Sequence, residues 1–350
     1  MSALDRIIRN AHDMRASDVH IAPGLPVRYR VDGRLVDADD RVLEPEDTEE
    51  LARAAAGDEY KRIKSIGELD MADTYDGDIR CRLNIFRSRG NAVLAIRLLA
   101  DSIPALDSLG LPDIMLEFPR YQKGIVLVTG ETGSGKSTTL AAELDRINHT
   151  RADHIITLED PIEYIYKPDK CSIDQREIGR DTESFADGLR AILREDPDVI
   201  LVGEMRDLDT IETALTAAET GHLVFGTIHT QSAADSIDRL VDVFPEARQR
   251  QIRMQLSMTL VAVVSQQLLV RREGKGRAVA CEVMVVNPAI RNLIREGKTP
   301  QIANTLATSS DIGSITMDNM LVRMARGRVI STETAVEAAH DPDYVRKLAR

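Results

Sequence analysis

The stretch that decides the fold is residues 123–148, which read K-G-I-V-L-V-T-G-E-T-G-S-G-K-S-T-T-L-A-A-E-L-D-R-I-N. An apolar, β-branched run at 125–128 enters a loop with three glycines, and the loop opens into a helical pattern near Lys136. Glycine suits a backbone that wraps closely around an anion, because a Cβ would obstruct the φ angles required. The order strand, glycine loop, helix therefore predicts a phosphate-binding loop at 130–137.

A glycine-rich surface turn is the structural alternative, and the Lys-Ser-Thr-Thr run at 136–139 argues against it. In this loop pattern Lys136 contacts the β- and γ-phosphates, and the Ser137 hydroxyl binds Mg²⁺. The predicted ligands are therefore a nucleoside triphosphate, which we take to be ATP because no N-K-x-D guanine-reading segment is present, and Mg²⁺. The predicted nucleotide-binding residues of the loop are Gly130, Thr132, Gly133, Ser134, Gly135, Lys136, Ser137 and Thr138.

Composition limits the classes of protein to which the chain can belong. At 350 residues it is long enough for two domains. A net charge of −12 with no tryptophan is a poor basis for nucleic-acid binding, so no direct nucleic-acid partner is expected. No apolar run approaches the roughly 20 residues that cross a bilayer, and residues 1–10 lack a signal-peptide core. We therefore expect a cytoplasmic protein.

The three cysteines, Cys81, Cys171 and Cys281, are widely spaced and form no C-x-x-C pair. This spacing indicates neither a disulfide framework nor a cysteine-rich zinc site. We expect them to be buried small apolar residues.

The chain is predicted to be an α/β protein with two domains. Alternating, turn-broken segments in residues 1–100 predict a small α+β domain, with helices at 3–14 and 45–56. Prolines and glycines at 101–119 predict an interdomain connection suited to act as a hinge. From 120 to 350, apolar strands alternate with helices, which predicts a mainly parallel sheet covered on both sides and a mostly helical C-terminal end.

The strands and helices of the second domain follow from the same periodicity. The expected strands are 125–129, 154–158, 199–202, 223–228 and, less clearly, 279–286. The expected helices are 137–148, 182–194, 209–220 and 233–243. The basic segment 271–277 is interpreted as a solvated hairpin turn rather than a binding site.

Acidic clusters follow two of these strands. Glu159 and Glu163 come after the second strand, and Glu204 and Asp207 after the third. Carboxylates at the carboxyl edge of a parallel sheet project into the crevice where ligands bind. Hydrolysis needs one such group to orient water and others to hold Mg²⁺ or its water shell. The alternative is that these residues only cap helices, and it weighs most for Glu159 and Asp207.

Two histidines bracket the fourth strand, His222 before it and His229 after it. They are seven positions apart along a strand, so one site is not expected to hold both rings. A hydrogen-bonding sensor of the γ-phosphate is a better interpretation of His229 than a catalytic base. No neighbouring ligand spacing predicts a metal site there.

Arginines become important if the active site lies between subunits, because a neighbour's guanidinium neutralises charge on the transferring phosphoryl group. Arg82 and Arg97 belong to the last strands of the first domain, and Arg194 to the nucleotide domain. Arg194 is a candidate nucleotide contact. Each of the three has a surface salt bridge as its alternative role.

Taken together, these stretches resemble the secretion-ATPase superfamily and, within it, the type IV pilus retraction ATPases. The resemblance runs nearly end to end. Besides the phosphate loop and the acidic and histidine stretches, it rests on A-S-D-V-H-I at 16–21, A-A-E-T-G-H at 217–222 and A-I-R-N-L-I-R-E at 289–296. Departures are Glu131, which stands where a proline is expected, and residues 305–317, which follow the usual pattern only loosely.

The resemblance implies a PAS-like N-terminal domain followed by a RecA-like P-loop ATPase domain, assembled as a homohexamer. It implies that Glu163 is the catalytic glutamate, Glu204 the Mg²⁺-associated acidic residue, and His229 the link between nucleotide state and conformation. Arg82 and Arg97 match the arginines that this family presents to nucleotide across a subunit boundary.

The resemblance also implies the biological setting: a motor at the cytoplasmic face of the inner membrane that pulls on a pilus platform protein. Membrane association would then be peripheral, through partners. Two alternatives stay open at this point. One is a type IV secretion export ATPase, and the other is a slowly hydrolysing, nucleotide-gated scaffold.

Overall fold

The computed structural model describes residues 2–31, 33–99 and 102–349. The chain forms two compact units. The first consists of Met1–Ser102 together with Pro161–Ile165, and the second of Ile103–Asp160 and Tyr166–Arg350. Each unit is described by itself below.

The first unit is an antiparallel sheet with three helices. The sheet order is β3-β2-β1-β6-β5-β4. The strands are β1 (Asp18–Ile21), β2 (Arg28–Val31), β3 (Arg34–Asp37), β4 (Glu68–Tyr75), β5 (Ile79–Ser88) and β6 (Asn91–Leu98). The helices are α1 (Ala3–Asp13), α2 (Pro45–Ala56) and α3 (Tyr60–Ile66). The helices at 3–14 and 45–56 were expected; β4 and α3 were not, because residues 57–78 carry no clear period.

Alternating burial explains why these segments form strands. Along β5 every second side chain is buried as far as Ile85, and the residues between them are partly exposed. Ile8, Ile63, Leu83 and Ile96 are almost completely buried in the core that this face shares with the helices. The opposite face of β5 and β6 is free to carry charged side chains.

The second unit contains a seven-stranded sheet in the order β13-β12-β7-β11-β10-β8-β9. All neighbouring pairs are parallel except β12 with β13. The strands are β7 (Gly124–Thr129), β8 (His154–Glu159), β9 (Ser172–Glu177), β10 (Val199–Val202), β11 (Leu223–Ile228), β12 (Leu260–Val270) and β13 (Arg277–Val285). The mainly parallel sheet predicted from the sequence is therefore confirmed.

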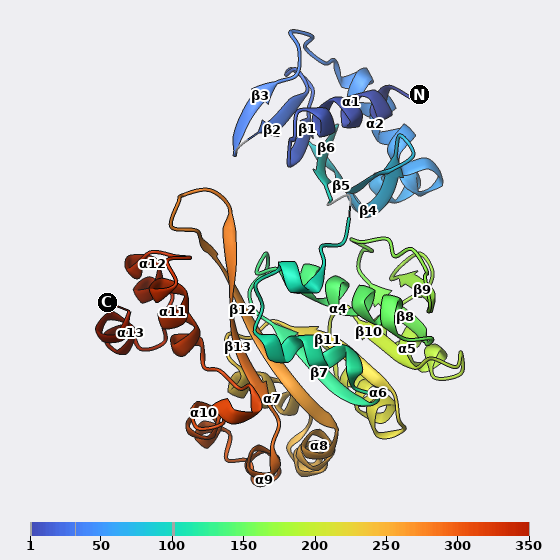
Figure 1. Ribbon diagram of the computed structural model, residues 1–350. Helices are drawn as coiled ribbons and strands as arrows, with labels where there is room; N and C mark the ends of the chain where they lie inside the picture. Colours follow the sequence, from blue (N-terminus) through green and yellow to red (C-terminus); the bar gives the residue numbers. More distant parts are fainter. Residues whose placement is uncertain (1, 32, 100–101, 350) are drawn as a thin grey trace. The chain divides into compact units, whose positions relative to one another are not determined.

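Helices connect and flank these strands. They are α4 (Lys136–Thr150), α5 (Phe185–Ile192), α6 (Leu208–Glu219), α7 (Ala233–Asp242), α8 (Glu246–Thr259), α9 (Pro288–Glu296), α10 (Ile302–Ala307), α11 (Met317–Arg326), α12 (Thr332–Glu337) and α13 (Pro342–Leu348). Helix α11 packs against β13, so the C-terminal helices lie beside the β12–β13 hairpin (Figure 1). Residues 337–340, from the end of α12 to the segment before α13, line the same cavity as the loop that follows β7.

The largest error of the sequence interpretation is β12, which lies in a region expected to be mostly helical. Its first half, L-V-A-V-V at 260–264, is a continuous apolar run, and such runs do not distinguish a buried strand from a buried helix. The strand pairs in parallel with β7 over 260–265. The turn expected at 271–277 is confirmed: the Gly274 amide donates to the Arg271 carbonyl at 2.8 Å.

The segment predicted as an interdomain connection is more ordered than its composition indicates. From Ile103 onward it belongs to the second unit, and Met115 and Phe118 are fully buried there. Residues Asp113–Arg120 form a 3-10 helix that includes Pro119. Prolines limit regular structure without preventing neighbouring apolar side chains from packing, so composition alone does not predict this packing.

Candidate nucleotide site

The loop after β7 has the geometry of a phosphate cradle. Gly130, Gly133 and Gly135 have φ values of +140°, +80° and +93°, which L side chains rarely adopt. A Cβ on Gly130 would lie 2.4 Å from the Gln266 carbonyl oxygen and 2.7 Å from Ser134 Oγ. Glycine at 130 is therefore required both by its conformation and by the close approach of β12.

The polar groups of the loop fit an anionic ligand. Lys136 Nζ donates to the carbonyls of Gly130 and Glu131 at 2.8 and 2.9 Å, so the ammonium folds back over the loop. Ser134 Oγ is buried and has no hydrogen-bond partner among the described residues. Gly135 precedes α4 and supplies no side-chain cap, and the N-terminus of this helix follows the loop directly, where helix amides commonly bind phosphate oxygens.

Glu204 and His229 meet at the same edge of the sheet. Glu204 follows β10, His229 follows β11 directly, and these two strands are parallel neighbours. His229 Nε2 lies 2.9 Å from Glu204 Oε1, and Arg206 also pairs with this carboxylate. The Glu204 side chain is 19% exposed and that of His229 is 39% exposed, so the pair is accessible to a ligand.

The position of Glu204 depends on the glycine before it. A Cβ on Gly203 would lie 2.8 Å from the Leu158 carbonyl oxygen, because the chain leaving β10 passes close to the end of β8. Only glycine permits this approach without a shift of the backbone. Nothing in the spacing of the sequence indicated this requirement.

A group of hydroxyls that the sequence interpretation missed joins the phosphate loop to the histidine segment. Thr129, the last residue of β7, accepts from the Thr230 amide at 2.9 Å, and the two hydroxyl oxygens lie 2.6 Å apart. Thr230 Oγ1 also lies 2.7 Å from Ser236 Oγ in α7. The loops after β7 and β11 are thus tied together directly before Gly130 and directly after His229.

The remaining acidic and histidine candidates have structural partners. Asp207 caps α6 by accepting from the Thr210 amide at 2.9 Å, as the capping alternative predicted. Glu159 accepts from Thr157 Oγ1 at 2.6 Å. His222 Nδ1 lies 2.8 Å from the Ala217 carbonyl oxygen, at the other end of β11 from His229. The two histidines do not share a site, as expected.

The arginine candidates of the first unit lie opposite one another. Arg82 of β5 and Arg97 of β6 are cross-strand partners. Arg82 pairs with Asp70 at 3.2 Å, and Arg97 with Asp18 at 3.1 Å. Burial opposes ionisation of Asp18, but hydrogen bonds from Ser17 and Arg97 prevail and lower its pKa. Asp70 lies on β4 and Asp18 on β1, so each arginine of the directly opposed pair has its own carboxylate, which offsets the repulsion between like charges.

The two other predicted residues lie elsewhere. Glu163 belongs to the Pro161–Ile165 segment, which is counted with the first unit, where Arg80 Nη2 donates to the Ile162 carbonyl at 3.2 Å. Arg194 is exposed just beyond α5 and donates to the Arg190 carbonyl at 2.9 Å. The roles of Glu163 and Arg194 stay predictions.

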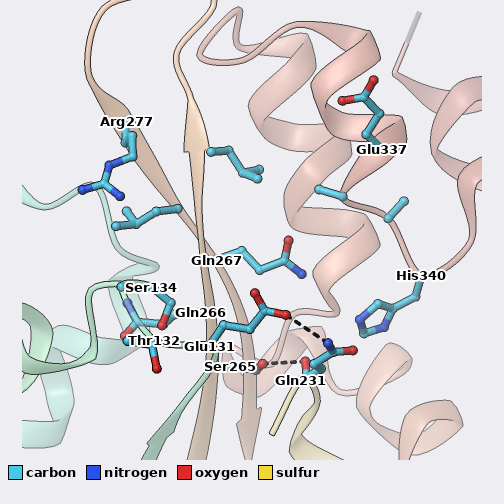
Figure 2. Close-up of a pocket in the computed structure, with 16 residues that line it drawn as sticks. Glu131, Thr132, Ser134, Gln231, Ser265, Gln266, Gln267, Arg277, Glu337 and His340 are labelled. Atoms are coloured by element: carbon cyan, nitrogen blue, oxygen red, sulfur yellow. Dashed lines mark hydrogen bonds between the residues drawn. The ribbon is translucent and has the colours of Figure 1, made fainter. Parts of the chain in front are cut away.

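A cavity of about 510 Å³ opens beside the phosphate loop (Figure 2). Its walls come from the loop itself, from the segment after β11, from β12 and β13, and from the α12–α13 connection. Glu131, Gln231, Arg277, Glu337 and His340 are among its polar lining residues. The cavity is large enough for the nucleoside part of a ligand whose phosphates occupy the loop.

Residues 1–336 match the family described as Type II/IV secretion system protein. The chain belongs to this secretion family. The family resemblance and the two-part α/β fold predicted from the sequence are therefore confirmed.

Individual members of the secretion family show how close the match is. The chain is 45% identical over 329 residues to the type IV pilus retraction ATPase PilT of Pseudomonas aeruginosa, covering 94% of this chain and 95% of that one. It is 47% identical over 276 residues to a twitching motility protein of Neisseria gonorrhoeae, covering 79% and 74% of the two chains. A solved structure of the pilus retraction motor PilT with bound ADP matches with a TM-score of 0.91 and 47% identity, over 98% of each chain.

None of the helices in the described part of this secretion family member is long and apolar enough to cross a membrane.

Proposed function

We propose that the chain is an ATP-hydrolysing motor that drives retraction of a type IV pilus and thereby twitching motility. The observation that carries this proposal is the meeting of three loops at one sheet edge. The phosphate loop follows β7, the histidine segment follows β11, and Glu204 follows β10, on three adjacent strands. The similarity to a retraction ATPase over nearly the whole chain supports the same function.

The chain's own residues suit the binding of ATP. The Lys136 ammonium would exchange its two loop carbonyls for β- and γ-phosphate oxygens, and the N-terminal end of α4 would face the same phosphates. Ser134 Oγ, buried beside them without a partner among the described residues, gains an acceptor when phosphate binds. Ser137 and Glu204 would hold Mg²⁺, partly through water, and the ion would neutralise charge on the phosphates.

His229 and Glu204 form the part of the site that responds to the γ-phosphate. In the described structure the carboxylate is occupied by His229 and Arg206. A γ-phosphate offers His229 a second acceptor, so the histidine can exchange partners between carboxylate and phosphate. Because Thr230 is tied to Thr129, this exchange moves a segment connected to the phosphate loop and to α7. Glu163 would orient the attacking water.

The active unit is a homohexamer in this proposal, with Arg82 and Arg97 of one subunit facing the nucleotide of its neighbour. The two arginines are cross-strand partners on β5 and β6, and their guanidinium groups would stabilise charge on the transferring phosphoryl group. The motor pulls on an inner-membrane pilus platform protein, and this partner holds it at the cytoplasmic face of that membrane.

Shared sites predict rescue in mixed assemblies. Arg82→Ala and Glu163→Ala proteins should each hydrolyse ATP at least about 10-fold more slowly than wild type, because each lacks a group near the transferring phosphoryl. Mixing the two should restore part of the rate, since some sites then combine an intact Arg82 with an intact Glu163. Steady-state ATP turnover measured across mixing ratios checks this. A rate at every ratio equal to the average of the two pure variants would contradict shared sites.

The motor function is tested in cells that lack their own pilus retraction ATPase. Expression of this chain should restore pilus retraction and twitching, scored by the spreading of colonies and by labelled-pilus microscopy. The matched control is the Lys136→Ala chain, which should assemble and fail to retract pili. Normal ATP hydrolysis without restored retraction would leave the ATPase in place and refute the assigned biology.

A further inference from the structure

Glu131 is the one acidic residue in the loop that is built to receive phosphate. Its backbone is fixed, because its carbonyl accepts from the Ser134 amide at 3.1 Å and from Lys136 Nζ at 2.9 Å. Its side chain is exposed and lines the cavity beside the loop. The structure thus places a carboxylate one residue from the glycine that opens the cradle.

A single partner holds this carboxylate among the described residues. Gln231 Nε2 donates to Glu131 Oε1 at 3.2 Å (Figure 2). The backbone of Gln231 is held in place, because Ser265 Oγ of β12 donates to the Gln231 backbone carbonyl at 2.7 Å. It lies two residues beyond His229, so the contact joins the start of the phosphate loop to the histidine segment.

The hydrogen bond from Gln231 keeps the negative charge of Glu131 in the lining of the cavity beside the phosphate loop. Other groups of the loop attract phosphate, whereas the Glu131 carboxylate repels it over distances within the Debye length of about 8 Å at 0.15 M salt. A glutamate side chain without a partner on the surface would turn toward water and away from the ligand. The hydrogen bond from Gln231 restricts this rotation of the Glu131 side chain.

We propose that the charge of Glu131 weakens nucleotide binding, and that Gln231 is a positioning residue that holds this carboxylate near the phosphate site. The inference rests on the proposed nucleotide function. Weak binding of the diphosphate suits a motor, which must release product to begin another cycle. Glu131 therefore sets affinity without taking part in the chemistry.

Binding of ADP to the full chain, measured by calorimetry, tests the proposal. Glu131→Gln removes the charge and keeps an acceptor for Gln231, so Kd for ADP should fall about 3- to 10-fold at low salt. At 1 M salt, where the Debye length is about 3 Å, the difference from wild type should largely vanish. Glu131→Ala should tighten binding similarly. Glu246→Gln, a charge removal on α8 outside the residues that line the cavity, should leave Kd unchanged.

The Gln231→Ala variant tests the second half of the proposal. It removes the side-chain donor but keeps the backbone carbonyl that Ser265 contacts, and it should tighten ADP binding about 2- to 3-fold by releasing the carboxylate. In the Glu131→Gln background the same change should have no further effect, a non-additivity that marks direct coupling.

The outcomes separate this inference from the proposed function. Equal Kd values for wild type and both Glu131 variants, or tightening that persists unchanged at 1 M salt, would overturn the role of the charge. Additive effects of the Gln231 and Glu131 changes would overturn the role of the hydrogen bond between Gln231 and Glu131. Absence of ADP binding by the wild-type chain would overturn the nucleotide function and this inference together.

Discussion

Lys136→Ala should reduce steady-state ATP turnover at least about 100-fold, which is the scale for loss of one group that stabilises charge in a transition state. The ammonium lies 2.8 and 2.9 Å from two loop carbonyls, at the start of the helix that would face the phosphates. Alanine leaves the backbone cradle in place and removes its only charged donor. Phosphate release measured at saturating ATP and Mg²⁺ checks the prediction.

The control for this change is Lys123→Ala. Lys123 is an exposed lysine directly before β7, outside the loop, and its removal should leave turnover within about 2-fold, as is usual for surface positions. The Lys136 variant loses two partly exposed hydrogen bonds, worth at most about 1 kcal/mol each, so it should remain folded, with its thermal unfolding midpoint lowered by a few degrees. Undiminished hydrolysis by a folded Lys136→Ala protein would end the motor proposal.

Glu204→Gln should reduce turnover about 100-fold or more while leaving the Kd for ADP within a few-fold of wild type. Glutamine keeps the size of the side chain and an oxygen that can accept from His229, but it removes the negative charge that Mg²⁺ or its water shell requires. The kcat for ATP hydrolysis should therefore fall by a larger factor than the affinity for ADP. Parallel measurements of kcat and of ADP affinity separate the two effects.

A matched glutamate is available on α6. Glu219 accepts from Gln255 Nε2 at 3.0 Å on the surface, and Glu219→Gln should leave both kcat and Kd unchanged. If Glu204→Gln hydrolysed ATP within 3-fold of wild type, the carboxylate would not belong to the metal-dependent step. Glu204→Ala should be at least as impaired, since it also leaves His229 and Arg206 without their shared acceptor.

Much of the second unit followed from periodicity alone. Strands at 199–202 and 223–228 have the predicted bounds, because short, mostly apolar runs of four to six residues between turn signals fit buried parallel strands. The same rule failed for β12, whose apolar run follows α8 without a break. Local pattern gives no reason to end a helix at Thr259; pairing with β7 does.

Part of the candidate site could be predicted from the sequence, and part required the tertiary structure. The spacing of the glycines at 130, 133 and 135 and the residues Lys136 and Ser137 specify a phosphate loop from sequence alone, since consecutive residues build it. The pairing of His229 with Glu204 and the threonine ties required the sheet order, which brings the ends of non-consecutive strands together.

The sequence by itself determined that this chain has a nucleotide-binding loop at the end of an apolar strand, in an α/β domain of a secretion ATPase type. Only the tertiary structure decided what surrounds that loop. Glu131 and Gln231 are 100 residues apart, and no sequence spacing relates them. They meet because parallel strands β7 and β11 end at the same edge of the sheet, where side chains from distant loops come within hydrogen-bonding distance.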